Sequence, residues 1–367
     1  MVDLYCNKDY VFLGLLVVIL LGSSILVNVF SLLWYLEKEG TETRKERYLK
    51  NLSSLKILHV FQMGVPLRYA SVLRISICGS GCNEIYTKDE VRYLKHDLRI
   101  LRLIETYSES VPQLVLMLTI IIQREEVDLI PHLKAVVSVV AISVSVTMYH
   151  RSMQSFHRDK TKPCGGSSVL YFLWNLLLIG SRVMVIVLFT SVFPHYITAH
   201  ILCSWAVLYF VAWKCKTKFK ESIDKVWLYR ATIALIWYFN WLNVMKSNSR
   251  WIRAIYHSLI VLDNVILGGF WVWQMKKSPP HFDLPLDPYE ILGVIISAYF
   301  TGLCLMIIFQ YCHQQTETVD RPKGTAKVKM LHTDCHHLRI EEDSADQATQ
   351  VSMVNKRMKI LADSFYS

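Results

Sequence analysis

The stretch from Val11 to Leu36 constrains this chain more than any other feature, because it is long, apolar and without one charged side chain. A helix needs about 20 largely apolar residues to cross the hydrocarbon core of a bilayer. A secretory signal peptide would have a shorter apolar core behind a basic segment, whereas Asp3 and Asp9 precede this one. Hydrophobic residues make up 53% of the chain and charged residues only 19%, which excludes an ordinary soluble domain. We therefore expect an all-α polytopic membrane protein.

Further apolar segments follow along the chain, and basic clusters separate them. These segments lie at about 51–79, 101–123, 133–150, 168–193, 196–213, 226–245, 251–275 and 289–312. Since Lys and Arg gather in cytoplasmic loops, a segment with basic clusters at both ends should not cross. Segments 51–79 and 226–245 have this character and are predicted to be re-entrant, which requires burial in protein or a wet cavity. The remaining seven would cross, with the N-terminus outside and the C-terminus in the cytosol.

The order of crossing and re-entrant segments predicts two parallel membrane repeats. Residues 1–150 would form the first repeat and residues 151–312 the second, each with one re-entrant hairpin. The second repeat has one helix more, so the first is expected to be N-terminally short. Residues 313–350 lack hydrophobic periodicity and are predicted to form a flexible cytosolic tail. Residues 351–367 would follow as an amphipathic helix.

Ionisable residues lie near the middle of several predicted spans. Arg182 and Asp263 are each isolated in a long apolar run, and Glu105 and Glu109 are four residues apart on one helix face. Each such charge costs roughly 2.5 to 3.5 kcal/mol at the bilayer centre, so these groups must be paired, protonated or wet. One interpretation is a structural ion pair, such as Glu109 with Arg182. The other is a hydrophilic track of mixed sign, with Arg68 as a second cation, for a polar or zwitterionic head group.

Other function classes fit less well. The net charge is +10, but the basic residues form short clusters between apolar runs instead of one face for nucleic acid. No GxxxxGK[ST] pattern for nucleotide binding occurs. His332, Cys335, His336 and His337 are crowded for a zinc site. We expect no cofactor, no nucleic acid partner and no covalent catalysis.

The C-terminal segment carries a helical stripe. Val354, Met358, Leu361 and Phe365 are spaced by four, three and four residues, with basic residues beside them. The pattern predicts an amphipathic helix, which would either anchor to the acidic inner leaflet or dock as a plug beneath the cavity.

Four longer motifs resemble one family of membrane proteins. They are SSVLYFLWNLLLIGSR, LYRATIALIWYFNWLNV, ETYSESVPQL and NKRMKILADSF. With them the chain, from about residue 11 to its end, resembles the XK-related proteins, and most of all the apoptosis-activated phospholipid scramblases among them. The resemblance implies eight spanning helices with two partly inserted hairpins, so most of the first helix would be missing here. The family's intramembrane charges match at Arg68, Glu105, Glu109, Arg182 and Asp263, whereas Met148 replaces a further acid.

The resemblance further implies an ATP-independent phospholipid scramblase of the plasma membrane that exposes phosphatidylserine in apoptosis. Caspase removal of the tail would activate it, and the DSAD run from Asp343 predicts a cut between Asp346 and Gln347. An overlapping IEED run would instead place the cut after Asp343. The implied partners are phospholipids including phosphatidylserine, a caspase and a single-span membrane chaperone. Two alternatives stay open: a non-catalytic subunit or chaperone for a partner membrane protein, and an ion channel or solute transporter.

Overall fold

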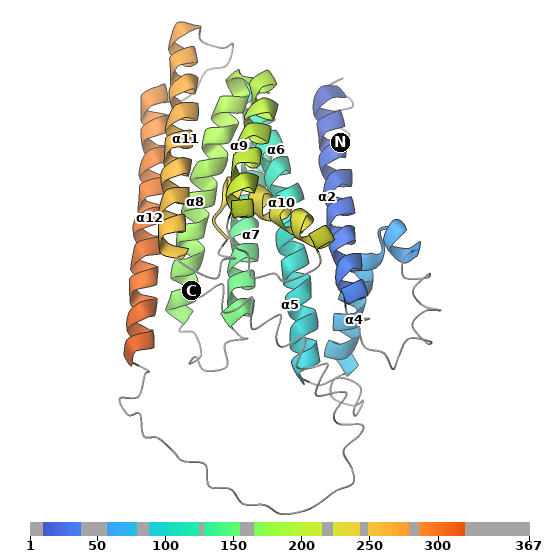
Figure 1. Ribbon diagram of the computed structural model, residues 1–367. Coiled ribbons are helices and arrows are strands. Elements are labelled where there is room, and N and C mark those ends of the chain that lie inside the picture. Colours follow the sequence, from blue (N-terminus) through green and yellow to red (C-terminus); the bar gives the residue numbers. More distant parts are fainter. Residues whose placement is uncertain are drawn as a thin grey trace, which may run out of the picture.

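The computed structural model confirms the predicted all-α class. It describes residues 10–37, 57–78, 88–124, 128–154, 165–214, 223–242, 249–278 and 286–319. Within these ranges the regular structure is helical, without strands. The elements, shown in Figure 1, are α2 (Tyr10–Glu37), α4 (Gly64–Cys78), α5 (Lys88–Glu105), η2 (Thr106–Ser110), α6 (Val111–Arg124), α7 (Leu129–Gln154), α8 (Gly165–Val192), α9 (Pro194–Lys214), α10 (Ile223–Phe239), α11 (Ser249–Lys277) and α12 (Pro288–Val319).

Six of these helices are long and apolar enough to cross a membrane by length and composition. They are α2, α7, α8, α9, α11 and α12, and they coincide with six of the seven predicted crossings. Figure 1 shows that α11 ends and α12 begins at the end of the bundle opposite to that where α5 begins. The chain is therefore a multi-pass α-helical membrane protein.

The seventh predicted crossing, 101–123, runs through the end of α5, the π-helical η2 and α6 as one uninterrupted helical run. η2 divides its apolar part, so neither α5 nor α6 alone is among the six candidate spans. The N–H of Val111 bonds to the carbonyl of Thr106, which is the i to i−5 step of a π-helix. Pro112 follows and has no N–H for the helical ladder. The regular ladder is thus interrupted in the middle of this run, beside Glu109.

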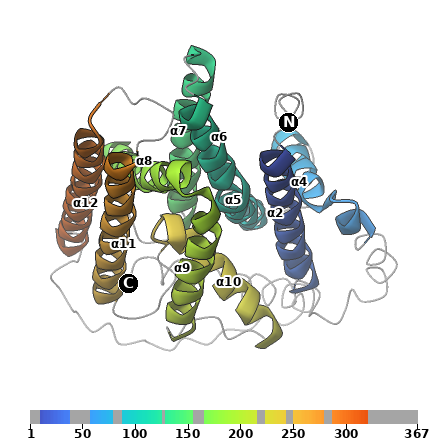
Figure 2. The same ribbon diagram turned by 90° about the horizontal axis from the view of Figure 1, so that it is seen from above.

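α8 is the central helix of the bundle. It contacts α6, α7, α9, α10, α11 and α12, and Figure 2 shows it between the α11–α12 pair and the α6–α7 pair. Its most apolar window is 67% buried, against 11% for α2 and for α9. Val183, Ile186 and Val187 on α8 are almost fully buried. Because lipid is as apolar as these side chains, close van der Waals packing stabilises this core more than exclusion from water does.

The two predicted re-entrant segments contain shorter helices. α10 has 17 residues and α4 has 15, which is about 26 and 23 Å of helix. Neither length reaches the about 30 Å of a hydrocarbon core. α10 lies obliquely across the bundle (Figure 1), and its last residues, Trp237, Tyr238 and Phe239, are buried. Both helices are shorter than the candidate spans, and the re-entrant character of the two segments stays a prediction.

α2 and α4 stand at one side of the bundle (Figure 2). α2 packs on α4, α5, η2 and α6. The apolar part of this contact includes Val27, Phe30, Trp34, Leu101 and Ile104. The opposite side of α2 exposes large apolar residues, which suits contact with lipid. α2 therefore has one protein-facing and one lipid-facing side.

Two predicted boundaries differ from the structure. The predicted tail was expected to begin at residue 313, but α12 continues to Val319, because the segment after Cys312 is polar without a Pro or Gly to end the helix. The predicted boundary between residues 150 and 151 falls within α7, and the division into two repeats stays a prediction. The caspase residues and the amphipathic stripe, within 320–367, lie outside the described residues.

Candidate functional site

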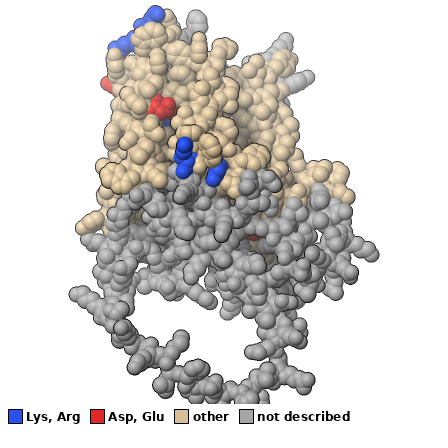
Figure 3. All heavy atoms as spheres, viewed as in Figure 1, with Lys and Arg blue, Asp and Glu red and all other residues tan. Residues whose placement is uncertain are grey.

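Charged side chains are few on the face of the protein that Figure 3 shows. Among the described residues of this face, isolated basic and acidic side chains lie on a mostly uncharged surface. Arg68 and Arg182, by contrast, are among the largest fully buried side chains of the protein. The charges predicted to lie at membrane depth fall into two buried clusters and one partly exposed stripe.

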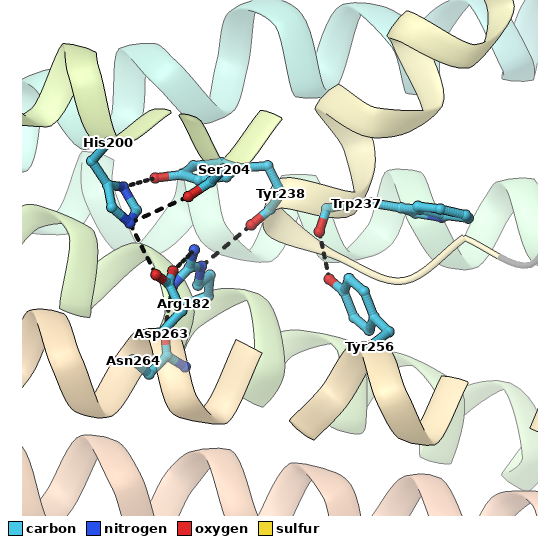
Figure 4. Close-up of polar contacts among 8 residues, drawn as sticks. All are labelled: Arg182, His200, Ser204, Trp237, Tyr238, Tyr256, Asp263 and Asn264. Carbon is cyan, nitrogen blue, oxygen red and sulfur yellow. Dashed lines mark hydrogen bonds and ion pairs between the residues drawn. The ribbon is translucent and has the colours of Figure 1, made fainter. Parts of the chain in front are cut away.

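Arg182, on α8, is the centre of a cluster that joins four helices (Figure 4). Its Nη2 pairs with Oδ2 of Asp263 at 2.5 Å, and its Nη1 donates to Oδ1 of Asn264 at 2.5 Å, both on α11. On α9, Nε2 of His200 lies 3.0 Å from Oδ1 of Asp263, while its Nδ1 lies 3.2 Å from the hydroxyl of Tyr238 on α10. The Arg182 side chain is 1% exposed and that of Asp263 is 25% exposed. The cation is therefore sealed, whereas the acid reaches the edge of the cluster.

The same cluster completes the buried end of α10. The last four carbonyls of a helix have no partner within it, and α10 ends at Phe239 inside the protein. Nε of Arg182 donates to the carbonyl of Tyr238 at 3.3 Å, and the hydroxyl of Tyr256 donates to the carbonyl of Trp237 at 2.6 Å (Figure 4). A cation at a helix C-terminus is also favoured by the helix dipole. Arg182 therefore fixes the position where the short helix ends.

The predicted pairing of Glu109 with Arg182 is wrong. Arg182 pairs with Asp263, because α8 packs directly on α11 and brings the two isolated charges together. Glu109 lies in η2, in a different polar group described below. The sequence gives the sign of each charge but not which helices are neighbours, and three acids, Glu105, Glu109 and Asp263, were available for this cation.

Arg68, on α4, is the centre of a second buried cluster. Its Nη1 lies 3.4 Å from Oδ2 of Asp97 on α5, and the two side chains are 2% and 6% exposed. Its Nε and Nη2 donate to the hydroxyl and the carbonyl of Ser31 on α2, at 2.9 and 2.8 Å. Nε2 of His59 lies 3.1 Å from the same hydroxyl. Arg68 therefore ties α4 to α2 and α5, and its carboxylate partner is an acid that sequence reasoning did not identify.

Glu105 and Glu109 lie on a polar stripe along α5, η2 and α6. The stripe consists of Arg102, Glu105, Glu109 and Gln113, at steps of three, four and four residues, and it extends over about 16 Å. Nη1 of Arg102 pairs with Oε1 of Glu105 at 2.8 Å, and these side chains are 55% and 29% exposed. Glu109 lies close enough to Ser23 and Gln113 to interact with both. Unlike the two buried clusters, the stripe is accessible from outside the protein.

Side chains before α4 and on α2 extend this stripe. Oγ of Ser23 lies 2.7 Å from Oγ of Ser108, and Ser24 donates to Oε1 of Gln62 at 2.8 Å. Gln62 has a φ of 61°, a left-handed conformation that is uncommon for residues other than glycine. The turn before α4 thus adopts an unfavourable backbone conformation where its side chain bonds to α2.

Tyr69 of α4 lies beside the stripe. It is 46% exposed and close enough to Arg102 and Glu105 to interact with both electrostatically. We call the whole set the polar seam, and it comprises Ser23, Ser24, Gln62, Tyr69, Arg102, Glu105, Ser108, Glu109 and Gln113. The seam lies where α2 and α4 meet the run of α5, η2 and α6.

An apolar groove lies elsewhere, between α8 and α12. Its volume is about 390 Å³, and its lining includes Leu177, Gly180, Met184, Ile291 and Ile295. None of the described residues that line it is charged, so this lining does not suit a head group. Among the residues that the structure describes, no three His, Cys, Asp or Glu side chains are arranged to hold a metal ion.

The predicted track residues thus do not form one group. Glu105 and Glu109 belong to the polar seam, Arg182 and Asp263 to the cluster on α8, and Arg68 to the cluster on α4. Sequence reasoning missed further members, namely Asp97, Arg102, His200, Tyr238 and Asn264. Two of these residues could have been found from the sequence. Asn264 follows Asp263 directly, and Arg102 lies one helical turn before Glu105.

The fold and these sites define a class of protein: a multi-pass helical membrane protein with sealed ion clusters inside and a polar stripe on its surface. Comparison with known proteins gives the family. The XK-related family model matches residues 1–314, so the chain belongs to the XK-related family, as the motifs indicated.

Individual members of this family are similar over most of the chain. XK-related protein 8 of Tetraodon nigroviridis is 34% identical, with 100% of this chain and 90% of the relative covered. The proteins of the same name from Gasterosteus aculeatus and Pan troglodytes are 38% and 30% identical, each over 81% of this chain and over 76% and 74% of the relative.

Proposed function

We propose that the protein is an ATP-independent phospholipid scramblase, in which head groups cross the bilayer along the polar seam while acyl chains stay in the surrounding lipid. The observation that carries this proposal is the exposure of Arg102 and Glu105, at 55% and 29%. Glu105 and Glu109 lie further inside the apolar segment 101–123 than Arg102, and exposed acids at such positions are costly unless water or a polar ligand meets them. A phospholipid head group is such a ligand, and no covalent chemistry is needed to move it.

The dimensions of the seam support this proposal. Its stripe extends over about 16 Å, roughly half of a hydrocarbon core of about 30 Å. It presents a cation, acids, hydroxyls and amides in succession. A mixed sequence of this kind favours head groups that carry both charges, including phosphatidylserine, over a simple ion.

The charged residues would then divide into two roles. Glu105 and Glu109 contact head groups, because both are partly exposed on the seam. Arg68 and Arg182 hold the helices beside and behind it, because both are sealed and fully engaged with protein groups. Asp263, 25% exposed, adds an acid at the edge of its cluster.

A reconstitution experiment tests this proposal. Purified protein is placed in liposomes that contain NBD-labelled phosphatidylcholine, and dithionite is added outside. Scrambling exposes lipid of both leaflets to bleaching, and Glu109→Gln is expected to slow that exchange. Glu290→Gln is the matched control, because Glu290 is an exposed acid in the first turn of α12, outside the seam.

Three other results would contradict the proposal. If Glu105→Gln and Glu109→Gln both scramble as the unaltered protein does, head groups do not use the seam. Ion conductance without lipid movement would select the channel or transporter alternative. Lipid movement that needs a second membrane protein would select the non-catalytic subunit or chaperone, for which a single-span partner is the candidate.

Regulation belongs to the same proposal. We place the protein in the plasma membrane with a cytosolic C-terminus, where caspase cleavage after Asp346 would remove the stripe from Val354 to Phe365. A tethered helix is held near millimolar effective concentration, so even weak docking covers the site until the tether is cut. Caspase-3 digestion followed by sequencing of the fragment identifies the bond. If Asp343→Ala and Asp346→Ala both leave stimulated scrambling unchanged, cleavage is not the switch.

A further inference from the structure

We propose that Arg102 and Glu105 are the head-group-selecting pair of the polar seam: the guanidinium takes the phosphodiester of a crossing phospholipid, and the carboxylate takes its cationic group. This inference rests on the proposed scramblase function and assigns a role to Arg102, which lies outside the charge set indicated by the sequence. The seam would then discriminate among lipids by the net charge of this pair.

The exposure of the pair sets it apart. In the part of the chain that the structure describes, the other arginine–carboxylate pairs have sealed cations: Arg68 is 2% exposed and Arg182 is 1% exposed. Arg102 is 55% exposed although its Nη1 lies 2.8 Å from Oε1 of Glu105. A pair that is both formed and accessible can exchange one partner for a ligand.

The bonding capacity of Arg102 fits a phosphodiester. A guanidinium has five N–H donors in a planar fork, and a phosphodiester offers two non-bridging oxygens that such a fork binds in bidentate fashion. The bond to Glu105 uses one of these donors. Arg102 lies at the start of the apolar segment 101–123, where an anionic oxygen from lipid would give its remaining donors an acceptor.

The neighbours complete a site for a zwitterion. Tyr69 approaches the pair from α4, and Glu109 is close enough to Arg102 to interact with it. Arg102, Glu105 and Glu109 together carry one positive and two negative charges. Arg102 lies at the first turn of the apolar segment 101–123 and about 10 Å along the axis from Glu109. A head group that arrives at one leaflet would therefore meet the cation first and the second acid deeper in the bilayer.

The test compares two lipids in one preparation. Rates of bleaching are measured for NBD-phosphatidylglycerol, which is anionic, and for NBD-phosphatidylcholine, which is zwitterionic, with the same acyl chains. Glu105→Gln changes the summed charge of Arg102, Glu105 and Glu109 from about −1 to about 0, so the ratio of the anionic to the zwitterionic rate should rise about fivefold, as expected for one partly exposed ion pair. Arg102→Gln should lower the ratio by a similar factor, and the double variant should return towards the original ratio.

Two controls separate selection from structure. Arg102→Lys keeps the charge but loses the fork, so the ratio should change less than in Arg102→Gln while the phosphatidylcholine rate falls. Arg151→Gln, at an exposed arginine of α7 outside the seam, should leave the ratio unchanged. If Arg102→Gln does not fold, Glu105→Gln and Arg102→Lys still give the comparison.

The inference and the proposed function fail in different ways. If the unaltered protein moves neither lipid, with intact or cleaved tail, the scramblase proposal itself fails. If it moves both and the Glu105 and Arg102 variants change both rates by one common factor, the pair only supports the fold and the selection role is refuted. Inorganic phosphate is a further test. If it slows the movement of both lipids by the same factor, the pair binds a free anion and does not select head groups, which also refutes the selection role.

Discussion

Replacing Asp263 by Asn should destabilise the protein through Arg182. The substitution keeps the size of the side chain and removes only its charge. The guanidinium of Arg182, 1% exposed, would then lose the carboxylate at 2.5 Å from Nη2 and stay buried without an anion. His200 would lose its carboxylate partner at the same time. Because α8, α9 and α11 meet at this acid, the effect should reach the whole bundle.

The magnitude follows from the contacts that remain. Removing one partner of a buried ion pair costs roughly 3 to 5 kcal/mol. Here the cation keeps Oδ1 of Asn264 and the carbonyl of Tyr238, and Asp263 is 25% exposed. These features place the cost of the substitution at about 2 to 3 kcal/mol, which is equivalent to a fall of about 3 to 4 °C in Tm for a chain of this size.

Fluorescence-detected size exclusion after heating in detergent gives the measurement. Asp263→Asn, Arg182→Met and the double variant form a cycle, and the double variant should lose less stability than the sum of the single losses, because it leaves no unpaired buried charge. Glu290→Gln should shift Tm by less than half as much, since its side chain is exposed. Additive losses in the cycle, or an unchanged Tm for Asp263→Asn, would refute the reasoning.

The remaining predictions concern helix packing around α8. A Cβ at Gly302 would lie 2.9 Å from Cδ2 of Leu178 and 3.2 Å from Cβ of Leu177, so Gly302→Ala should cost about 1 to 3 kcal/mol by overpacking and lower Tm. Gly293→Ala on the same helix has no atom within 4 Å of the new Cβ and should leave Tm equal or higher. Asn240→Leu removes the 2.9 Å bond to Oδ1 of buried Asn175 and should cost about 1 to 3 kcal/mol; an unaltered Tm would show that this bond is replaceable.

The fold was largely predictable because hydrocarbon imposes few solutions. Each crossing needs a long apolar helix, so the run from Val11 and five of the other predicted crossings could be placed from hydropathy. The segments 51–79 and 226–245 were distinguished by their flanking basic residues, and they contain the shorter α4 and α10. The end of α12 was less predictable, since polar residues after Cys312 end an apolar pattern without ending a helix.

The site was predictable as a set of residues but not as a set of pairs. Isolation in an apolar run marks Arg182 and Asp263 as unusual, yet only helix packing decides that they are partners. Asp97 could not be singled out from the sequence, because it lies in the part of α5 that has many charged residues. Arg102 was missed for a similar reason, because basic residues are common where a span begins. Its exposure beside Glu105 depends on how α2 and α4 approach, which no local pattern records.

Arg182 and Arg102 differ in how completely protein groups satisfy them, and under the proposed function this difference would separate a supporting residue from one that meets lipid. Arg182 is bonded to Asp263, Asn264 and the end of α10, and it is sealed. A cation with its acceptors already in place has little capacity for a ligand, so its loss should act on stability. Arg102 bonds to Glu105, and both side chains are partly exposed on the surface of the protein. An exposed pair of this kind can exchange partners at little cost, so its loss should act on which lipids cross and only weakly on Tm. Measuring Tm and lipid selectivity on the same variants therefore separates the two roles.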